Sequence, residues 1–515
     1  MGIKSNLRNL LRASIKNNYT EDINLSNINI SKKNNIYTTD IAITIAQKLK
    51  KDPRLVAEKI AKNLYDNKVI DKITIDNIGI IEITLQKSYL LEFINDIINE
   101  KSNYGRSNLG NAINISIECL EIDDISTLTS KNVCQAIYSD NLSRILSYCG
   151  YSPTKECYLK INNETLNKCS EIVKQYYKNI CNGNLNKFDS EGKALNYYLH
   201  KIAKSIFDVH LIKKQNESLD FFKEEVINNF INDIKIKLDK FRINFDYYIK
   251  SSDLYINGII EDTLSKLQPY TEIKSNGLNV KVGDDNVNLV TNDGTYTKVL
   301  TDLAYCINNT KLNGKNLITI ESSPTKDYNT LNELLKLLKI DYKVYYRKLY
   351  LENIENLSES KLNDLFENDN LNLIRLFCAD YISKEYHKTK LDEYFIKNFS
   401  NPFYYIEEVT HKIDNILLKN HKKLNILERN LQIINDFEYN LLEKLGEFSD
   451  IVLESCQSCN PKLIFNYVYE LVLLYDEYNF KEREYNLKEI NLLYATKIII
   501  SNSLELIGLI PREEI

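Results

Sequence analysis

The chain of 515 residues contains a single methionine, Met1, no tryptophan and only five histidines. A catalytic loop that requires an internal methionine is therefore excluded. Chemistry that needs clustered imidazoles can use only residues scattered along the chain: His200, His210, His387, His411 and His421. Glycine and proline are scarce as well, with 14 and 7 residues, and neither a Gly-x-Gly-x-x-Gly motif nor a P-loop motif occurs.

Long apolar runs are also missing. No stretch of about 18 apolar residues occurs, which predicts no membrane-spanning helix and no membrane partner. The first residues contain no apolar signal core, and Asn6 stands where a myristoylation motif needs Ser or Thr, so we expect a cytoplasmic protein. Ten scattered cysteines are most simply reduced, buried thiols. Cys456 and Cys459 form one Cys-x-x-Cys pair, but a zinc site needs two further ligands, and we predict no metal site.

The charge balance is ordinary but uneven along the chain. The net charge of −5 and the pI of about 5.8 argue against binding of nucleic acid by bulk electrostatics. Residues 1–112 carry 17 basic and 12 acidic groups, whereas residues 371–515 carry 17 basic and 23 acidic groups. If nucleic acid binds, the N-terminal segment is the electrostatic candidate, and the C-terminal segment must rely on shape and stacking.

Hydrophobic periodicity predicts a compact α+β module at the N-terminus. Residues 4–18 have helical spacing, and residues 37–64 fit two further helices. Residues 72–85 are β-rich, and residues 89–98 return to a helical pattern. The module is expected to end in a polar, glycine-bearing linker near residue 112.

The rest of the chain divides into an α/β part and a helical part. Residues 113–120 suit a buried strand and residues 133–148 an amphipathic helix, an order that opens nucleotide-binding α/β domains but also occurs in any βα unit. Long helical segments follow at residues 163–181, 193–214 and 219–241. Two strands around a helix are expected at residues 316–320, 328–338 and 342–351. Residues 371–515 are almost wholly helical by period, which predicts an all-α bundle.

In this order the segments resemble an arginyl-tRNA synthetase, a class I aminoacyl-tRNA synthetase, over nearly the full length. The resemblance is carried by residues 35–42 and 51–61, by residues 291–305 in the middle, and by residues 466–469 and 504–508 near the end. It implies a multidomain α/β plus all-α protein with three domains. These are an additional N-terminal domain that contacts tRNA (1–112), a Rossmann-like catalytic domain with a helical insertion (113–370), and a DALR-type anticodon-binding helical bundle (371–515).

The resemblance weakens at the first class I signature, the HIGH motif (His-x-Gly-His). Its two histidines bind ATP phosphates in the family. Counting back from Ser139–Arg144, which matches the following helix, the four positions are Thr129, Ser130, Lys131 and Asn132. Both histidines are absent, and Lys131 stands where only glycine lets adenine approach the backbone. Upstream, residues 121–124 bring carboxylates near the expected phosphates. Each lost donor is worth about 3 kcal/mol by analogy with oxyanion holes.

Two further signatures differ as well. The KMSKS-type loop, whose lysines hold pyrophosphate in the family, should lie before Asn372–Arg375, which matches the family's Asp-Ala-Leu-Arg segment. The chain there reads Leu351–Glu355, which is acidic where the family is basic. The family's Gly-Ala-Asp-His-His segment corresponds to Glu321–Thr325, again without histidine.

The arginine pocket is partly kept. Asp302 matches the family aspartate that pairs with the substrate guanidinium, a bidentate geometry suited to arginine. Lys298 replaces the family tyrosine that packs on arginine, and a cation there would pair with Asp302 or repel the substrate. An equally good interpretation is that Asp302 caps the helix that follows it.

Candidate tRNA contacts come from the N-terminal domain and the bundle. Asn401-Pro-Phe-Tyr-Tyr405 matches the family's Asn-Pro-Val-Tyr-Tyr segment. The resulting candidates are Tyr37, Asn401, Tyr404, Tyr405 and Tyr469. Tyrosines of residues 467–478 could stack on unpaired anticodon bases, although core packing is the more frequent role of any one of them.

Two functional hypotheses remain open. The preferred one is a paralogue that keeps the fold, and with it tRNA(Arg) or protein binding, but has lost or impaired ATP-dependent activation of arginine. The alternative is a divergent, active arginine–tRNA ligase that uses ATP and Mg²⁺, with Lys131 and Lys298 supplying phosphate contacts. A monomer is favoured in either case.

Overall fold

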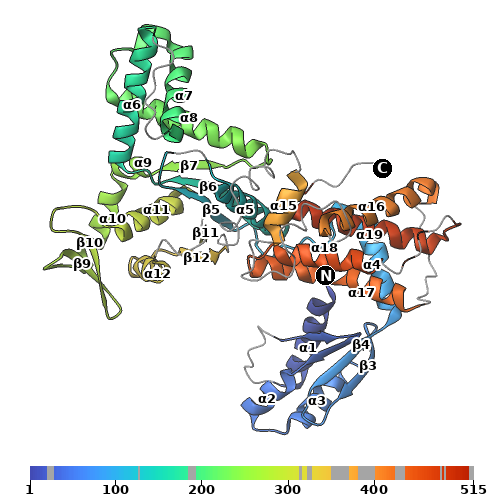
Figure 1. Ribbon diagram of the computed structural model, residues 1–515. Helices are drawn as coiled ribbons and strands as arrows, with labels where there is room; N and C mark the ends of the chain where they lie inside the picture. Colours follow the sequence, from blue (N-terminus) through green and yellow to red (C-terminus); the bar gives the residue numbers. More distant parts are fainter. Residues whose placement is uncertain are drawn as a thin grey trace. The chain divides into compact units, whose positions relative to one another are not determined.

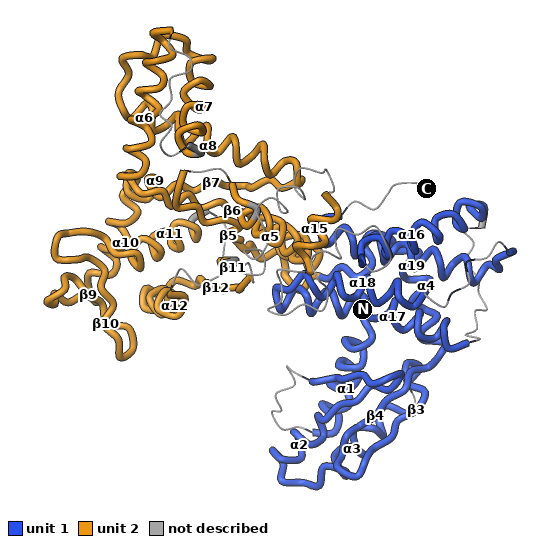
Figure 2. The backbone as a smooth tube through the Cα atoms, in the orientation of Figure 1, with its two compact units in different colours: residues 1–107, 388–515 blue, residues 108–387 orange. Residues whose placement is uncertain are grey.

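The computed structural model describes residues 1–19, 28–65, 67–125, 128–183, 193–312, 316–321, 327–349, 371–380, 401–423, 435–475, 478, 480 and 483–509. The chain forms two compact units (Figure 2). Unit 1 joins residues 1–107 to residues 388–515, and unit 2 comprises residues 108–387. The expected three-domain division at residues 112 and 370 remains a prediction, since the N-terminal module and the bundle here share one unit.

The N-terminal module of unit 1 is an antiparallel sheet covered by helices. Its elements are α1 (Ile3–Asn18), β1 (Ser31–Lys33), β2 (Ile36–Thr39), α2 (Ile41–Leu49), α3 (Pro53–Lys62), β3 (Ile70–Ile75), β4 (Ile81–Leu85) and α4 (Lys87–Glu100). The strand order is β1-β2-β4-β3. Asp52 caps α3 by accepting a hydrogen bond from the Arg54 N–H at 2.8 Å, and Pro53 occupies the first helical position, where its missing N–H costs no hydrogen bond.

In the described part of unit 1, the C-terminal bundle is formed by α16 (Pro402–Lys419), α17 (Asp436–Gln457), α18 (Lys462–Leu473) and α19 (Leu487–Leu506). The helix α4 packs between α17 and α19, so it belongs to the bundle as much as to its own module (Figure 1). Gly446 on α17 makes this possible, since a Cβ atom there would lie 2.5 Å from the Phe93 ring. Asp450 on α17 in turn accepts hydrogen bonds from the N–H groups of Lys4 and Ser5, which fixes the start of α1.

Unit 2 is built on a five-stranded parallel sheet in the order β12-β11-β5-β6-β7. Its first half contains β5 (Asn114–Ile122), α5 (Ser130–Tyr148), β6 (Ser152–Leu159), α6 (Asn163–Cys181), α7 (Lys193–His210), α8 (Leu219–Asp239) and β7 (Tyr247–Lys250). Helices α6, α7 and α8 pack on one another as an insertion between β6 and β7 (Figure 1). The predicted Rossmann-like sheet with a helical insertion is confirmed.

The second half of unit 2 completes the sheet. It contains α9 (Ser251–Ile256), α10 (Ile259–Leu267), β8 (Thr271–Lys274), β9 (Gly277–Val282), β10 (Asp285–Val290), α11 (Lys298–Leu312), β11 (Asn316–Glu321), α12 (Tyr328–Leu337), β12 (Lys343–Lys348) and α15 (Leu371–Asp380). Strands β8, β9 and β10 form a separate antiparallel sheet. Buried side chains of α11, α12 and β11 form a core around Leu303, Leu317 and Leu334, which fixes α11 against the sheet.

Candidate functional site

The carboxyl edge of the parallel sheet is where a ligand is expected, because the strand order reverses beside β5. Three polar side chains meet there. Glu121 lies near the end of β5, Lys160 directly follows β6, and Asp302 lies on α11. Their positions in the sequence are far apart, and the sheet topology brings them together.

A partly buried ion pair joins these three elements. The Nζ atom of Lys160 lies 2.5 Å from Oδ1 of Asp302 and 3.7 Å from Oε1 of Glu121. The side chain of Asp302 is 3% exposed and that of Lys160 is 18% exposed. The same ammonium lies 5.8 Å from the centroid of the Tyr158 ring, which stacks on the Tyr305 ring at 4.2 Å. Two carboxylates and one aromatic face therefore hold this lysine.

A cavity of about 240 Å³ opens beside the ion pair. Its lining comes from the end of β6, the loop that follows, the first residue of α6, α9 and α11: Tyr158, Lys160, Ile161, Asn162, Asn163, Ser251, Ser252, Leu254, Tyr255 and Thr301. The volume is below the range that begins at about 300 Å³ for drug-sized ligands. The cavity can therefore take a small polar molecule or one side chain of an amino acid.

The structure excludes one of the two roles predicted for Asp302. This residue lies inside α11, which begins at Lys298, so the interpretation that it caps the helix is wrong. Lys298 is exposed at the first position of the helix, and the lysine that pairs with Asp302 is Lys160. Sequence reasoning missed Lys160 because nothing in its local pattern distinguishes it from other lysines that follow a strand.

The four positions of the expected His-x-Gly-His motif begin α5. Thr129 is the N-cap, and its Oγ1 accepts a hydrogen bond from the Asn132 N–H at 3.3 Å. The Asn132 side chain in turn accepts one from the Thr129 N–H at 3.0 Å, which completes a capping box. Lys131 is half-buried in the first turn, and the side chain of Ser130 lies outside the described residues. Two of the four positions thus stabilise the helix start.

Most residues of the other two signature segments lie outside the described residues. Leu351–Glu355 and Ser322–Thr325 lie outside the described residues, and Glu321 is described only as the last residue of β11. Asn372–Arg375 lies in α15, as its predicted helical pattern requires. Arg375 is fully buried there.

Arg375 connects α15 to α5 through a buried network. Its Nη2 atom lies 2.8 Å from Oδ2 of Asp140 and also donates to the Phe241 carbonyl oxygen at 2.9 Å. Its Nη1 atom donates to Oδ1 of Asn141 at 3.0 Å. Burial alone would raise the pKa of Asp140, but the charges of Arg375, Lys155 and Arg144 hold it well below its usual range. This network fixes the helix whose N-terminus carries Thr129.

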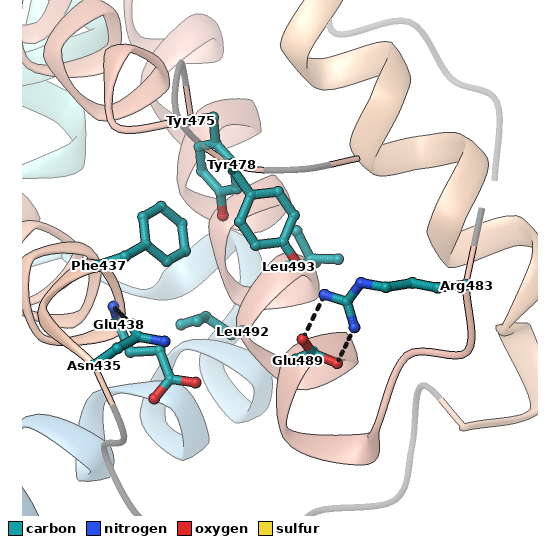
Figure 3. A pocket seen from close by; sticks show the side chains of 9 residues that line it. All are labelled: Asn435, Phe437, Glu438, Tyr475, Tyr478, Arg483, Glu489, Leu492 and Leu493. Carbon is teal, nitrogen blue, oxygen red and sulfur yellow. Dashed lines mark hydrogen bonds and ion pairs between the residues drawn. The ribbon is translucent and has the colours of Figure 1, made fainter. Parts of the chain in front are cut away.

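A second cavity, of about 320 Å³, lies in the helical bundle of unit 1 (Figure 3). Phe437 and Tyr478 stack with their ring centroids 5.1 Å apart, and Tyr475 contacts both rings. On the other side, Arg483 forms a two-fold pairing with Glu489 at 2.7 and 3.2 Å, which Figure 3 shows facing the aromatic group. Planar aromatic rings beside a guanidinium are the elements that hold an unpaired nucleobase.

The structure separates the predicted tRNA contacts into buried and accessible residues. Tyr37 is fully buried beneath Lys32, so its ring has no face to offer a base and that prediction is wrong. Asn401 is also fully buried and caps α16 by accepting from the Phe403 N–H at 3.0 Å, so it is a structural residue. Tyr404, Tyr405 and Tyr469 are half-buried and keep accessible surface.

The bundle tyrosines of the sequence prediction divide in the same way. Tyr467 and Tyr475 are buried and donate hydrogen bonds to the Lys444 carbonyl oxygen and to Thr496. Tyr469 stacks on Phe465 at 6.1 Å and contacts Tyr405 edge-on at 6.3 Å. The more frequent role, core packing, therefore holds for Tyr467 and Tyr475, while Tyr469 and Tyr478 keep part of their surface exposed.

No metal site is found in the described part of the chain, where no group of three or more His, Cys, Asp or Glu side chains could hold an ion. Cys456 is buried and Cys459 half-buried, with its Sγ 3.8 Å from the Cys456 carbonyl oxygen. The described helices include none that combines the length and apolarity needed to cross a bilayer.

Comparison with known proteins identifies the family. Residues 3–85 match the model of the arginyl-tRNA synthetase N-terminal domain, and residues 407–515 match that of the DALR anticodon-binding domain. Arginine–tRNA ligase 1 of Halalkalibacterium halodurans is 27% identical over 504 residues, covering 92% of this chain and 91% of the relative. The arginine–tRNA ligase of Bacillus subtilis is 25% identical and covers both chains completely. The chain belongs to the arginyl-tRNA synthetase family.

Solved structures agree with this assignment at the level of the fold. The arginyl-tRNA synthetase of Thermus thermophilus has a TM-score of 0.70 at 14% identity, with complete coverage of both chains. That of Plasmodium falciparum has a TM-score of 0.72 at 17% identity, with 99% of each chain covered. The predicted resemblance and fold class are therefore confirmed, and the anticodon-binding assignment of the bundle rests on the DALR match.

Proposed function

We propose that this chain is an arginine–tRNA ligase, which joins arginine to tRNA(Arg) with ATP as co-substrate and Mg²⁺ as the cation of the nucleotide. The observation that carries the proposal is colinear similarity to arginine–tRNA ligases over more than nine-tenths of this chain and of the relatives. The similarity spans the N-terminal module, the parallel sheet and the bundle, which are the parts that a ligase of this family needs to bind tRNA and to activate an amino acid.

The carboxyl edge of the sheet supplies the groups for arginine. Asp302 is a buried carboxylate beside a cavity of about 240 Å³, and a carboxylate accepts two parallel hydrogen bonds from a guanidinium. Phosphates of ATP would lie at the N-terminus of α5, where the helix dipole favours negative charge. Lys131 in the first turn of α5 and Lys298 at the start of α11 are candidate cations for these phosphates, since lysine serves phosphate as a point charge.

The bundle supplies the groups for tRNA. The ring pair of Phe437 and Tyr478 offers a stacking surface, and Arg483 and Glu489 offer hydrogen bonds to a base or a phosphate at the same cavity. Tyr404, Tyr405 and Tyr469 remain candidates for further contacts. The N-terminal segment, with its excess of basic groups, contributes attraction to the phosphate backbone.

A second candidate is a family member that binds tRNA without activating arginine. Two observations favour it. The capping box of Thr129 and Asn132 occupies positions where the family places two histidines, and Lys160 already neutralises Asp302. In this case the protein sequesters or delivers tRNA, alone or with a protein partner.

One assay separates the candidates, namely tRNA-dependent exchange of pyrophosphate into ATP in the presence of arginine, followed by aminoacylation of tRNA(Arg). A ligase gives exchange well above that of a matched preparation without the protein, and the exchange requires arginine. Absence of exchange, with tRNA binding that weakens as salt rises, supports the second candidate. Absence of both contradicts both candidates.

The role of the bundle cavity is tested separately. Tyr478→Ala is expected to weaken tRNA(Arg) binding by about 1–3 kcal/mol, because base stacking on an aromatic ring contributes that much. Tyr494→Ala, which changes a half-buried tyrosine of α19 outside the cavity lining, is the matched control. The affinities are compared in a filter-binding titration at fixed salt. If Tyr478→Ala binds tRNA as tightly as both Tyr494→Ala and the wild type, the cavity has no part in tRNA binding.

A further inference from the structure

Lys160 stands out because its ammonium is the cation that a guanidinium would replace. It lies 2.5 Å from Oδ1 of Asp302 and 3.7 Å from Oε1 of Glu121, and Lys160 is one of the residues that line the cavity. The lysine is part of the chain and therefore present in every molecule. A guanidinium that pairs with both oxygens of Asp302 has to displace this ammonium from Oδ1.

The surroundings allow such a movement. The side chain of Lys160 is 18% exposed, whereas that of Asp302 is 3% exposed, so the lysine is the accessible partner. The cavity beside it is lined by polar side chains that can receive an ammonium: Asn162, Asn163, Ser251 and Ser252. Lysine has a flexible four-carbon stem, and its ammonium makes a point contact, whereas a guanidinium pairs with a carboxylate through two parallel hydrogen bonds.

We propose that Lys160 is an internal competitor of arginine, which fills the guanidinium subsite of Asp302 until the substrate displaces it. This inference rests on the proposed function, which supplies arginine as the ligand. The buried carboxylate is thereby paired with a cation in both states, by Lys160 when the site is empty and by the substrate when it is bound. A buried aspartate without any partner would be strongly unfavourable.

The size of the effect follows from the population of the open subsite. A ligand that binds only the open form has its dissociation constant raised by the reciprocal of the open fraction. If the lysine occupies the subsite in nine of ten molecules, removing its charge strengthens arginine binding about tenfold. The analogue citrulline is neutral, so removing the charge of Lys160 should not strengthen its binding.

The test is isothermal titration calorimetry of L-arginine with the wild-type chain and with Lys160→Met. We expect the dissociation constant to fall at least tenfold in K160M, and no such gain for L-citrulline. K160M/D302N should lose the gain because the carboxylate is gone. The matched control is K168M, which breaks an exposed ion pair to Glu164 at 2.6 Å on α6 and should leave arginine affinity unchanged. Equal arginine affinity in the wild type and K160M would overturn the proposal.

A second measurement covers the case in which K160M is poorly stable. Melting temperatures are then measured by circular dichroism. Arginine should raise the melting temperature of K160M by more than that of the wild type, because the bound arginine replaces the missing cation. Citrulline should not do so. A K160M protein whose melting temperature responds to arginine no more than that of the wild type contradicts the proposal.

The calorimetric test of Lys160 and the ligase assay can fail independently of each other. A gain of arginine affinity in K160M together with absent exchange in the wild type would overturn the proposed ligase activity and keep Lys160 as the occupant of a guanidinium subsite. Robust exchange in the wild type, with no gain in K160M, would keep the ligase and overturn the role of Lys160.

Discussion

Asp140 and Asp302 are two aspartates of the same unit whose side chains are each 3% exposed, yet their surroundings differ. Asp140 contacts three cations at 2.8 to 2.9 Å, those of Arg375, Lys155 and Arg144. Asp302 contacts Lys160, and that lysine lines a cavity. The first cluster holds α15 and β6 to α5, whereas the second leaves room for a ligand. Burial of an ion pair alone therefore does not mark a candidate site, and the adjacent cavity is what makes the second cluster a candidate.

The largest effect is expected at the first cluster. Arg375→Met should lower the free energy of unfolding of unit 2 by about 3–5 kcal/mol, because it leaves a buried carboxylate without its buried partner. This free energy is measured by urea denaturation, monitored by circular dichroism. The control is Arg144→Met, which removes a 40% exposed arginine from the same carboxylate and should cost less than about 1 kcal/mol. Similar losses in both variants would contradict the structural role of Arg375.

A smaller loss of unfolding free energy is expected at the second cluster, the ion pair of Lys160 and Asp302. Lys160→Met should lower the free energy of unfolding by about 1–3 kcal/mol, since Asp302 keeps its burial but loses a charged hydrogen-bond partner. K160M/D302N should regain part of this loss, because the uncompensated charge is removed. If the double variant is no more stable than K160M in the same urea titration, the ion pair does not account for the loss.

The pH dependence of stability should follow Asp140. Its folded-state pKa lies well below the ordinary value of about 3.9, so the unfolded chain takes up the proton first as the pH falls. Stability from this group is fully present above about pH 4 and is lost as the pH falls toward the folded-state pKa. Asp140→Asn should flatten the slope of unfolding free energy against pH below about pH 4. An unchanged slope would show that other carboxylates dominate.

The smallest effect is expected at the start of α5. Thr129→Ala should cost about 1 kcal/mol of unfolding free energy, the ordinary value of a lost N-cap. Arginine affinity measured by calorimetry should stay unchanged, because the hydroxyl serves the helix. A large loss of arginine affinity with unchanged stability would instead give Thr129 a role at the ligand.

Most of the fold could be predicted from the sequence. Periodicity placed α1, α5, α6 and β11 within a few residues of their bounds, because amphipathic helices and buried apolar strands carry their own pattern. Strand β6 could not be predicted in this way. Glu156 in its interior is a buried carboxylate that accepts from Tyr305 and Asn309 of α11, which are partners that no local pattern announces.

The candidate site was predictable only in part. Asp302 could be found by its match to a family segment, but its partner Lys160 could not, since the two are 142 residues apart in the chain. Tyr37 and Asn401 matched or neighboured family segments as well, and the structure buries both. A motif match identifies a position, but it does not say which side of an element that position faces.

The sequence by itself determined most of the helices, the strands β5 and β11, the family, and the absence of the histidines and the methionine that the family's signatures use. These properties follow from local sequence patterns or from counts of residue types. Only the tertiary structure decided which cation pairs with Asp302 and that α4 packs on the C-terminal bundle. Such contacts join residues from distant segments, and the parallel sheet and helix packing that unite them arise from the chain as a whole.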